Sequence, residues 1–289
     1  MDLRWGERSQ VEVDDLAIHV EHADGPADAP VLAGLHGFAS GTFTWAGVAP
    51  LLTPRFPFVA WDRPPFGRSE RPRVRAGQPD PYGTPVVVRQ AEAVLRSTIG
   101  DRPVVLVGHS AGTVVATALV AAGGLDVAGV VLIAPALDAA PPPLVRRLAT
   151  LPGASLVGSR ALRLAVLGAA PALRRVGRHR TPLLDATAAE TARTLRRAGT
   201  ADGLWHLTAT WTPPPPLDEL RPLGVPTLVV GGADDRISSP VSTEIVADRM
   251  AAQLHVLDGV GHAAHEQEPE LVAELVADFV EGWAGKTSQ

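Results

Sequence analysis

The residues best suited to do chemistry in this sequence surround a serine. Ser110 is the centre of the pentapeptide Gly-His-Ser-Ala-Gly at 108–112, which follows an apolar run at 104–107 and precedes a helical pattern at 113–122. A serine on a sharp turn between a strand and a helix is held in a strained conformation that projects its hydroxyl clear of the sheet. Small residues on either side let the strand and the helix approach each other. This context favours a nucleophilic serine over an ordinary glycine-rich turn.

A serine hydroxyl is a weak nucleophile, so it needs a base within hydrogen-bond reach and an acceptor that orients the base. The candidate base is His262, which follows a predicted strand; Gly261 before it frees the backbone, and this favours it over the neighbouring His265. The stretch 262–266 lacks the His-Glu-x-x-His spacing of a helical zinc site, and no third ligand stands out. The sequence therefore predicts a general base here and no metal.

Three aspartates are candidates for the acidic partner of the histidine. Asp234 and Asp235 directly follow the apolar run at 227–230, and we expect only one of them to face His262 while the other is solvated or caps the turn. Asp138 follows the apolar run that ends at 133 and is more typical of a turn residue. The residues by themselves leave this choice open.

Acyl transfer also requires two backbone N–H groups that bind the negatively charged oxygen of the intermediate. Ala111, directly after the serine, is expected to supply one. Phe38, in the loop after the apolar run at 31–35, is expected to supply the other, because Gly37 lets the backbone turn inward. His36 and His109 are interpreted as buried structural histidines.

Alternating strands and helices must position these residues. Apolar runs predict strands at 31–35, 58–61, 104–107, 127–133, 227–230 and 254–257, and helical patterns occur at 86–99, 113–122, 241–250 and 270–283. Most runs are continuously apolar, as in parallel strands covered on both faces. The stretch 10–22, with Asp14-Asp15 at its centre, predicts an antiparallel hairpin at the sheet edge. The predicted fold class is α/β, a mostly parallel doubly wound sheet.

One segment interrupts this alternation. No convincing strand occurs over 144–212, which is rich in arginine, alanine and leucine and is bracketed by proline runs at 141–143 and 213–216. Proline stiffens connections, so these runs are interpreted as the hinges of an insertion. Between 141 and 212 there are eleven arginines against three acidic residues, a net charge of +8 that leaves −13 for the rest of the chain. We expect these arginines to extend from amphipathic helices and pair with the acidic core; an anionic substrate or a membrane surface is the alternative.

The apolar composition of this segment predicts an apolar pocket. Trp205 and Trp211 lie near its end, and Phe38, Phe43 and Trp45 are candidates for the pocket mouth. Aromatic residues in helices are more often part of a core, which is the competing interpretation for all five.

Length and composition set the remaining bounds. A chain of 289 residues suits one large domain or a domain with an insertion, and the absence of cysteine excludes disulfides and a thiolate nucleophile. The net charge of −5 gives no nucleic-acid signature. The first residues lack an apolar signal core, and the longest apolar stretch, 127–137, is about half of what a membrane span requires. The prediction is a soluble cytoplasmic protein; the oligomeric state cannot be read from the sequence.

Together these motifs resemble those of the α/β-hydrolase superfamily over nearly the whole chain. The similarity is carried by His36-Gly37-Phe38, by the Asp-Arg-Pro-Pro-Phe-Gly-Arg-Ser run at 62–69, by the turn around Ser110, and by Asp235 with Gly261-His262. Matching the family pattern Gly-x-x-Asp-Arg implies that the acid is Asp235. The resemblance also implies a core domain at 1–136 and 217–289, with a helical cap at 137–216 over the active site. Pro65 departs from the family, since many relatives have glycine there.

The predicted function is that of a serine hydrolase that cleaves carboxylic esters of small, apolar molecules. Its catalytic residues would be Ser110, Asp235 and His262, with an oxyanion hole at Phe38 and Ala111. No cofactor is implied, because these groups supply the chemistry themselves. The same residues could serve a C–C bond hydrolase of β-diketones or a lactonase. A non-catalytic ligand-binding member of the fold is the alternative from another class.

Overall fold

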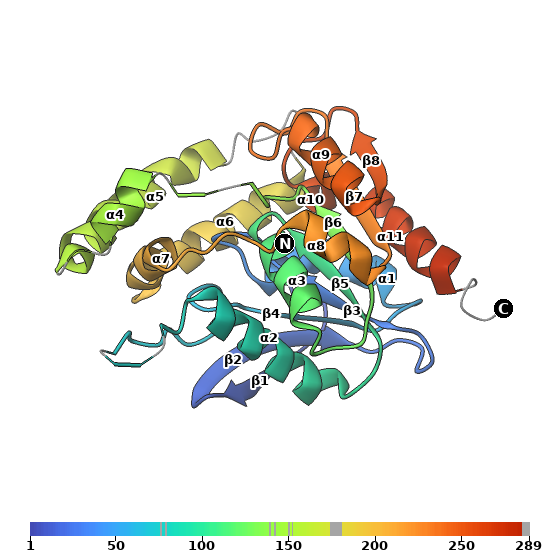
Figure 1. Cartoon of the computed structure of the whole chain (residues 1–289), viewed down its shortest axis with the longest axis horizontal. Helices are drawn as coiled ribbons and strands as arrows, with labels where there is room; N and C mark the ends of the chain where they lie inside the picture. Colours follow the sequence, from blue (N-terminus) through green and yellow to red (C-terminus); the bar gives the residue numbers. More distant parts are fainter. Residues whose placement is uncertain are drawn as a thin grey trace.

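The centre of the molecule is an eight-stranded sheet with the strand order β1-β2-β4-β3-β5-β6-β7-β8 (Figure 1). The computed structural model describes residues 1–75, 77–78, 80–138, 140–141, 143–149, 151, 153–173 and 181–284. The strands are β1 (Glu7–Val13), β2 (Leu16–Ala23), β3 (Val31–Leu35), β4 (Phe58–Trp61), β5 (Val104–His109), β6 (Val127–Ile133), β7 (Thr227–Gly232) and β8 (Gln253–Leu257). Strand β2 pairs antiparallel with β1 and β4, and the pairs from β4 to β8 are parallel. The predicted α/β class with a mostly parallel sheet is confirmed.

The predicted edge hairpin is confirmed and begins three residues earlier than expected, at Glu7. Val13 pairs with Leu16, so the loop consists of Asp14 and Asp15 alone. Both aspartates have positive φ, 52° and 59°. Two successive residues of positive φ give the two-residue turn whose twist matches that of antiparallel strands.

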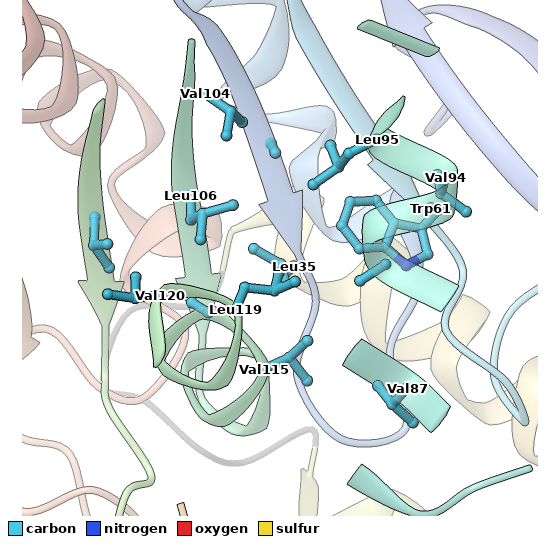
Figure 2. Close-up of a cluster of buried hydrophobic side chains, with 14 of the residues drawn as sticks. Leu35, Trp61, Val87, Val94, Leu95, Val104, Leu106, Val115, Leu119 and Val120 are labelled. Atoms are coloured by element: carbon cyan, nitrogen blue, oxygen red, sulfur yellow. The ribbon is translucent and has the colours of Figure 1, made fainter. Parts of the chain in front are cut away.

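The parallel strands are apolar throughout because helices cover both faces of the sheet. Alternate residues of a strand belong to opposite clusters: Leu106 of β5 lies in one apolar cluster, and Val105 and Val107 lie in the other. Figure 2 shows the first cluster, in which Leu106 points toward Leu119 of α3 (Ala111–Ala122). The helix α2 (Thr84–Ile99) covers the same face, whereas α1 (Ala49–Leu52) and α11 (Pro269–Ala284) cover the other. This two-sided burial explains why the strand signal was unbroken apolarity rather than alternation.

Several elements extend beyond the predicted ranges. Strand β5 continues to His109 and β7 to Gly232, because backbone pairing continues with Ile133 and Leu257 respectively. Helix α3 begins at Ala111 directly after the turn, and α2 begins at Thr84 with a proline in its first turn. The remaining core helices are α8 (Leu217–Leu220), α9 (Pro240–Met250) and α10 (Ala264–Gln267), with short 3-10 turns η1 (Thr42–Ala46) and η2 (Arg221–Leu223).

The segment between β6 and β7 is helical in its described part, as the sequence predicts. It contains α4 (Pro143–Ala149), α5 (Ala154–Leu173), α6 (Pro182–Arg196) and α7 (Thr200–Ala209). Helices α4 and α5 pack on α7, and α6 also contacts η1 and α10 of the core. In Figure 1, α4 and α5 form the outer edge of this group. Among the described residues, no helix has the length and apolar character needed to cross a membrane. The domain boundaries at 137 and 216 stay a prediction.

Candidate active site

Ser110 lies on a turn that only small neighbours permit. It connects β5 to α3 with φ 51° and ψ −120°, a conformation that side chains rarely adopt. A Cβ at Gly112 would lie 2.0 Å from the carbonyl oxygen of Leu35, and one at Gly108 would lie 3.0 Å from the backbone of Gly112. The backbone N–H of Ser110 donates to the carbonyl of Ile133 at 2.9 Å, which fixes the turn against β6. The hydroxyl is therefore held at the carboxyl end of β5.

The structure brings Ser110, His262 and Asp235 into one hydrogen-bonded chain. Nε2 of His262 lies 2.8 Å from Oγ of Ser110, and its Nδ1 lies 2.8 Å from Oδ2 of Asp235. A carboxylate can only accept, so Nδ1 carries the hydrogen and Nε2 is free to accept from the serine hydroxyl. The imidazole is thus in the tautomer that a general base requires.

Asp235 is positioned by its own loop. Its side chain is fully buried, and Oδ1 accepts from the N–H groups of Ile237 and Ser238 at 2.7 and 3.0 Å. Asp234 instead uses its backbone N–H, which donates to the carbonyl of Val260 at 2.9 Å. Strand β7 therefore ends in a turn that directs Asp235, and not Asp234, toward His262.

Asp138 and His265 lie outside this hydrogen-bonded chain. Asp138 is exposed and its Oδ2 accepts from the hydroxyl of Ser242 at 3.0 Å, as befits a turn residue. His265 is fully buried, with Nε2 2.8 Å from Oγ1 of Thr44. Burial lowers the pKa of His265 to about 3, so its ring is neutral. The structure therefore favours His262 as the base and excludes Asp138 as its acidic partner.

The two candidate oxyanion donors lie on either side of the serine. Ala111 is the first residue of α3, and N–H groups in the first turn of a helix have no partner within it. Phe38 follows Gly37, where a Cβ would lie 3.3 Å from Cβ of Ser110. This close approach brings the loop after β3 next to the serine, which is the arrangement that the Gly37 prediction requires.

His36 and His109 support the surrounding loops, as the sequence predicts. Nε2 of His36 accepts from the backbone N–H of Arg63 at 2.9 Å, so Nδ1 donates to the carbonyl of Gly37 at 2.8 Å. Nε2 of His109 lies 3.0 Å from the carbonyl oxygen of His262 and donates to it. Burial lowers the pKa of His36 to about 3 and that of His109 well below its ordinary value. Both rings are neutral and hold backbone rather than substrate.

Sequence reasoning missed two supporting side chains in α10. Oε1 of Gln267 accepts from the N–H of Gly261 at 2.8 Å and so fixes the loop that carries His262. The carboxyl of Glu266 is buried and accepts from Oγ1 of Thr187 in α6 at 2.7 Å and from Oγ1 of Thr44 in η1. Nothing in a short His-Glu-Gln run signals burial. The family motif was the available signal, since it places this stretch next to the histidine.

The run at 62–69 forms a buried loop beside the site. The carboxyl of Asp62 accepts from the N–H groups of Thr42 at 2.6 Å and Arg68 at 2.7 Å. Gly67 has φ 55°, and a Cβ there would overlap the Asp62 carboxyl at 1.9 Å. This glycine is required by close approach, and the loop positions η1 and the next residue, Arg63. Burial lowers the pKa of Arg63 to about 10, so the guanidinium is charged at neutral pH.

A cavity of about 340 Å³ opens above Ser110. Its walls come from the core and from the helical segment and are mostly apolar: Phe38, Arg63, Tyr82, Ala111, Val114, Ile237, Leu207 and Trp211 are among them. Two expectations for the mouth are wrong. Trp45 is fully buried against Phe58, and Phe43 is buried in η1. Trp205 packs on Gly158 of α5, so of the two tryptophans only Trp211 lines this cavity.

Within the described ranges, no three His, Asp or Glu side chains are grouped in a way that could hold a metal ion. The hydrogen-bonded chain and the cavity therefore have to be interpreted through the organic groups that they contain. Those groups are a hydroxyl, an imidazole, a carboxylate and backbone N–H donors at one end of an apolar space. This set suits attack on a carbonyl carbon.

Comparison with known proteins identifies relatives along nearly the whole chain. The model of the alpha/beta hydrolase family matches residues 31–275. YugF of Bacillus subtilis, an uncharacterized hydrolase, is 26% identical over 277 residues, which cover 93% of this chain and 96% of that protein.

Two solved structures illustrate the shared fold. A thermophilic esterase from Thermogutta terrifontis has a TM-score of 0.74 at 20% identity, covering 96% of this chain and 99% of the other. Est816, described as an N-acyl homoserine lactone degrading enzyme, has a TM-score of 0.70 at 21% identity, covering 94% and 100%. At these identities the similarity is one of fold.

Proposed function

Because the chain belongs to the alpha/beta hydrolase family, we propose that it is a serine hydrolase that cleaves carboxylic esters through an acyl-enzyme intermediate. The observation that carries the proposal is the continuous hydrogen-bonded chain from Ser110 through His262 to Asp235, with 2.8 Å at both links. The serine end of that chain opens into an apolar cavity. A hydroxyl, a base and an orienting carboxylate in this order are what nucleophilic attack by serine needs.

The proposed reaction has two halves. Oγ of Ser110 attacks the ester carbonyl carbon as its proton moves to Nε2 of His262, and the Asp235 carboxylate stabilises the resulting imidazolium. The N–H groups of Phe38 and Ala111 bind the developing oxyanion. His262 then protonates the leaving alcohol. Water, deprotonated by the same nitrogen, attacks the acyl group and releases the carboxylic acid and free Ser110.

Residues 137–216 form a cap over this site in our proposal. Leu207 at the end of α7 and Trp211 beyond it line the cavity above Ser110. Thr187 of α6 binds the buried carboxyl of Glu266, which anchors the segment to the core. The core would then supply the chemistry and the cap the apolar wall that selects the substrate.

The test is hydrolysis of p-nitrophenyl esters of increasing acyl length by the wild type and Ser110→Ala. We expect activity in the wild type and a loss of about 10⁶-fold in the variant, by analogy with serine hydrolases that lose their nucleophile. A fluorophosphonate probe should label the wild type and not the variant. An active Ser110→Ala protein would refute the proposal. An inactive wild type that still takes the label would direct attention to C–C substrates, and one without label to a ligand-binding role.

A lactonase is the second candidate, because the structural neighbour Est816 is described as a lactone-degrading enzyme. A lactone is a cyclic ester, so the same nucleophile and base would open it. Comparing kcat/KM for N-acyl homoserine lactones and for open-chain esters of the same acyl length separates the two. A preference of at least tenfold for the lactone would replace the leading proposal with this one.

A further inference from the structure

The outer layer of the helical segment exposes an unusual amount of apolar surface. Val157 and Leu164 of α5 are each 73% exposed, and Leu144 of α4 is 66% exposed. Leu148 in α4 and Leu151 after it are exposed as well. Single exposed leucines are normal on a protein surface, but a group of them on two adjacent helices marks an interaction site. We call these five residues, with the arginines between them, the α4–α5 face.

The spacing of these residues directs them away from the core. Val157, Ala161 and Leu164 are exposed at i, i+4 and i+7 of α5, and so lie on one side of the helix. The opposite side packs inward: Leu162 contacts the cluster around Phe66. A helix that buries one side and presents a second apolar stripe outward has a face that its own chain does not cover. In Figure 1 this layer lies at the edge of the molecule.

The polar residues of the face are cationic. Arg147, Arg160 and Arg163 are exposed among the leucines and valines. They belong to the segment 141–212, whose net charge is +8, whereas the rest of the chain carries −13. Apolar residues interleaved with arginine are typical of helices that lie in the interface of an anionic membrane. A second copy of the chain would present the same positive face and be repelled from it.

The face is continuous with the rim of the catalytic cavity. The guanidinium of Arg146 lies 4.7 Å from the ring centroid of Trp211, and Trp211, Ala140 and Pro141 line the cavity above Ser110. A lipid surface against α4 would therefore adjoin the cavity opening. An apolar molecule dissolved in that surface would have a short path to the cavity.

We propose that the α4–α5 face docks this protein on the surface of a membrane that contains anionic lipids. The leucines and valines enter the interfacial layer, and the arginines bind the lipid phosphates. Binding is peripheral, since no described helix could cross a bilayer. Docking does not depend on the reaction proposed for Ser110, although it would supply that reaction with membrane-dissolved esters.

The experiment is vesicle co-sedimentation with pure phosphatidylcholine or with phosphatidylcholine containing anionic phosphatidylglycerol, at low and high salt. We expect at least tenfold stronger partitioning to the anionic vesicles, and a loss of that preference at high salt. Equal binding to both vesicles, no binding to either, or a preference that survives high salt would overturn the proposal.

Two matched variants locate the surface. Val157→Asp with Leu164→Asp should lower partitioning at least tenfold. The control Val241→Asp with Ile245→Asp changes two aliphatic residues of α9, which are 63% and 51% exposed, and should leave it unchanged. Circular dichroism and thermal unfolding check that both variants are folded. If the control and the α5 variant lose binding equally, the assigned face is wrong.

A charge variant and a mass measurement complete the test. Arg160→Gln with Arg163→Gln should reduce binding to anionic vesicles while leaving the weak binding to neutral ones. Light scattering on a sizing column reports on self-association. A dimer that Val157→Asp with Leu164→Asp converts to a monomer would identify the face as a contact between copies, and would overturn the proposal. Because none of these readouts uses catalysis, failure of the esterase proposal would not affect them.

Discussion

The sheet core and the α4–α7 segment differ in what fixes their side chains. In the core, Ser110, Asp235 and His262 follow the ends of β5, β7 and β8, and the backbone pairing of parallel strands sets the positions of those ends. In the segment, helices pack on one another through side chains, and one whole layer remains exposed. Backbone pairing tolerates little adjustment, whereas helix packing can shift. The difference teaches that the chemistry resides in the rigid region and substrate selection in the adaptable one.

The largest expected effect is at the acid of the core. Asp235→Asn keeps the shape of the loop but replaces the acceptor opposite Nδ1 of His262 with an amide, so the imidazole can adopt the wrong tautomer. We expect kcat to fall about 10⁴-fold with the fold intact. Asp234→Asn is the matched control, since Asp234 does not face His262, and it should retain activity within a few fold. Equal losses in both variants would contradict the assignment of Asp235.

The second test compares a glycine from each region. A Cβ at Gly112 would lie 2.0 Å from a backbone oxygen, that of Leu35, whereas a Cβ at Gly158 of α5 would lie 2.1 Å from the Trp205 ring. A ring can rotate and a strand carbonyl cannot. We expect Gly112→Ala to cost about 3–5 kcal/mol of unfolding free energy. Gly158→Ala should cost less than about 2 kcal/mol, because the gain in helix propensity offsets part of the clash.

Urea unfolding measures both variants. Similar losses in the two would mean that the helical segment is packed as rigidly as the strand ends. That result would remove the contrast between the two regions.

The third test concerns the contact that joins the two regions. Burial raises the pKa of Glu266 from 4.5 to about 7, against the opposing hydrogen bonds from Thr44 and Thr187. The folded chain therefore keeps a proton that the unfolded chain loses. The stability from this group is complete below about pH 4.5 and is lost as the pH rises toward 7.

Glu266→Gln mimics the protonated form and removes this dependence. Relative to the wild type, the variant should gain about 1–3 kcal/mol between pH 5 and pH 8. Urea unfolding at the two pH values measures the change. Glu281→Gln is the control, since Glu281 is exposed and pairs with Arg55 at 2.7 Å. A pH dependence of Glu266→Gln equal to that of the wild type would show that the buried carboxyl is not coupled to folding.

The sequence predicted the core better than its details, for physical reasons. Runs that are apolar throughout identify strands covered on both faces, so β3, β4 and β6 match the predicted ranges. The ends of β5 and β7 were missed, because Gly231, Gly232 and Gly108 pair through backbone alone and carry no side-chain signal.

The same limits apply to the site. Residue types and order suggested Ser110 and His262, but adjacent aspartates differ only in the direction that the turn after β7 gives them. The family pattern, and not the residues themselves, distinguished Asp235 from Asp234. Phe43, Trp45 and Trp205 were expected near a pocket because they are aromatic. Aromatic character does not reveal direction, and these three rings point into packed regions.

The smallest expected effect tests the adaptable region at its contact with substrate. Trp211 lines the cavity, whereas Trp205 packs on Gly158 within the helical segment. Removing the Trp211 ring takes apolar surface from the cavity wall without touching the hydrogen-bonded chain at Ser110. Trp211→Ala should therefore raise KM for long acyl chains about tenfold, equivalent to about 1.4 kcal/mol of lost apolar contact, and leave kcat within a few fold.

Trp205→Ala provides the contrast, since it should lower thermal stability and leave the preference for acyl length unchanged. Steady-state kinetics over a series of acyl lengths, with thermal unfolding of both variants, separates the two effects. If Trp211→Ala lowered kcat as strongly as it raised KM, the cap would take part in positioning the reacting atoms. Rigid placement of chemistry would then extend beyond the strand ends into the helical segment.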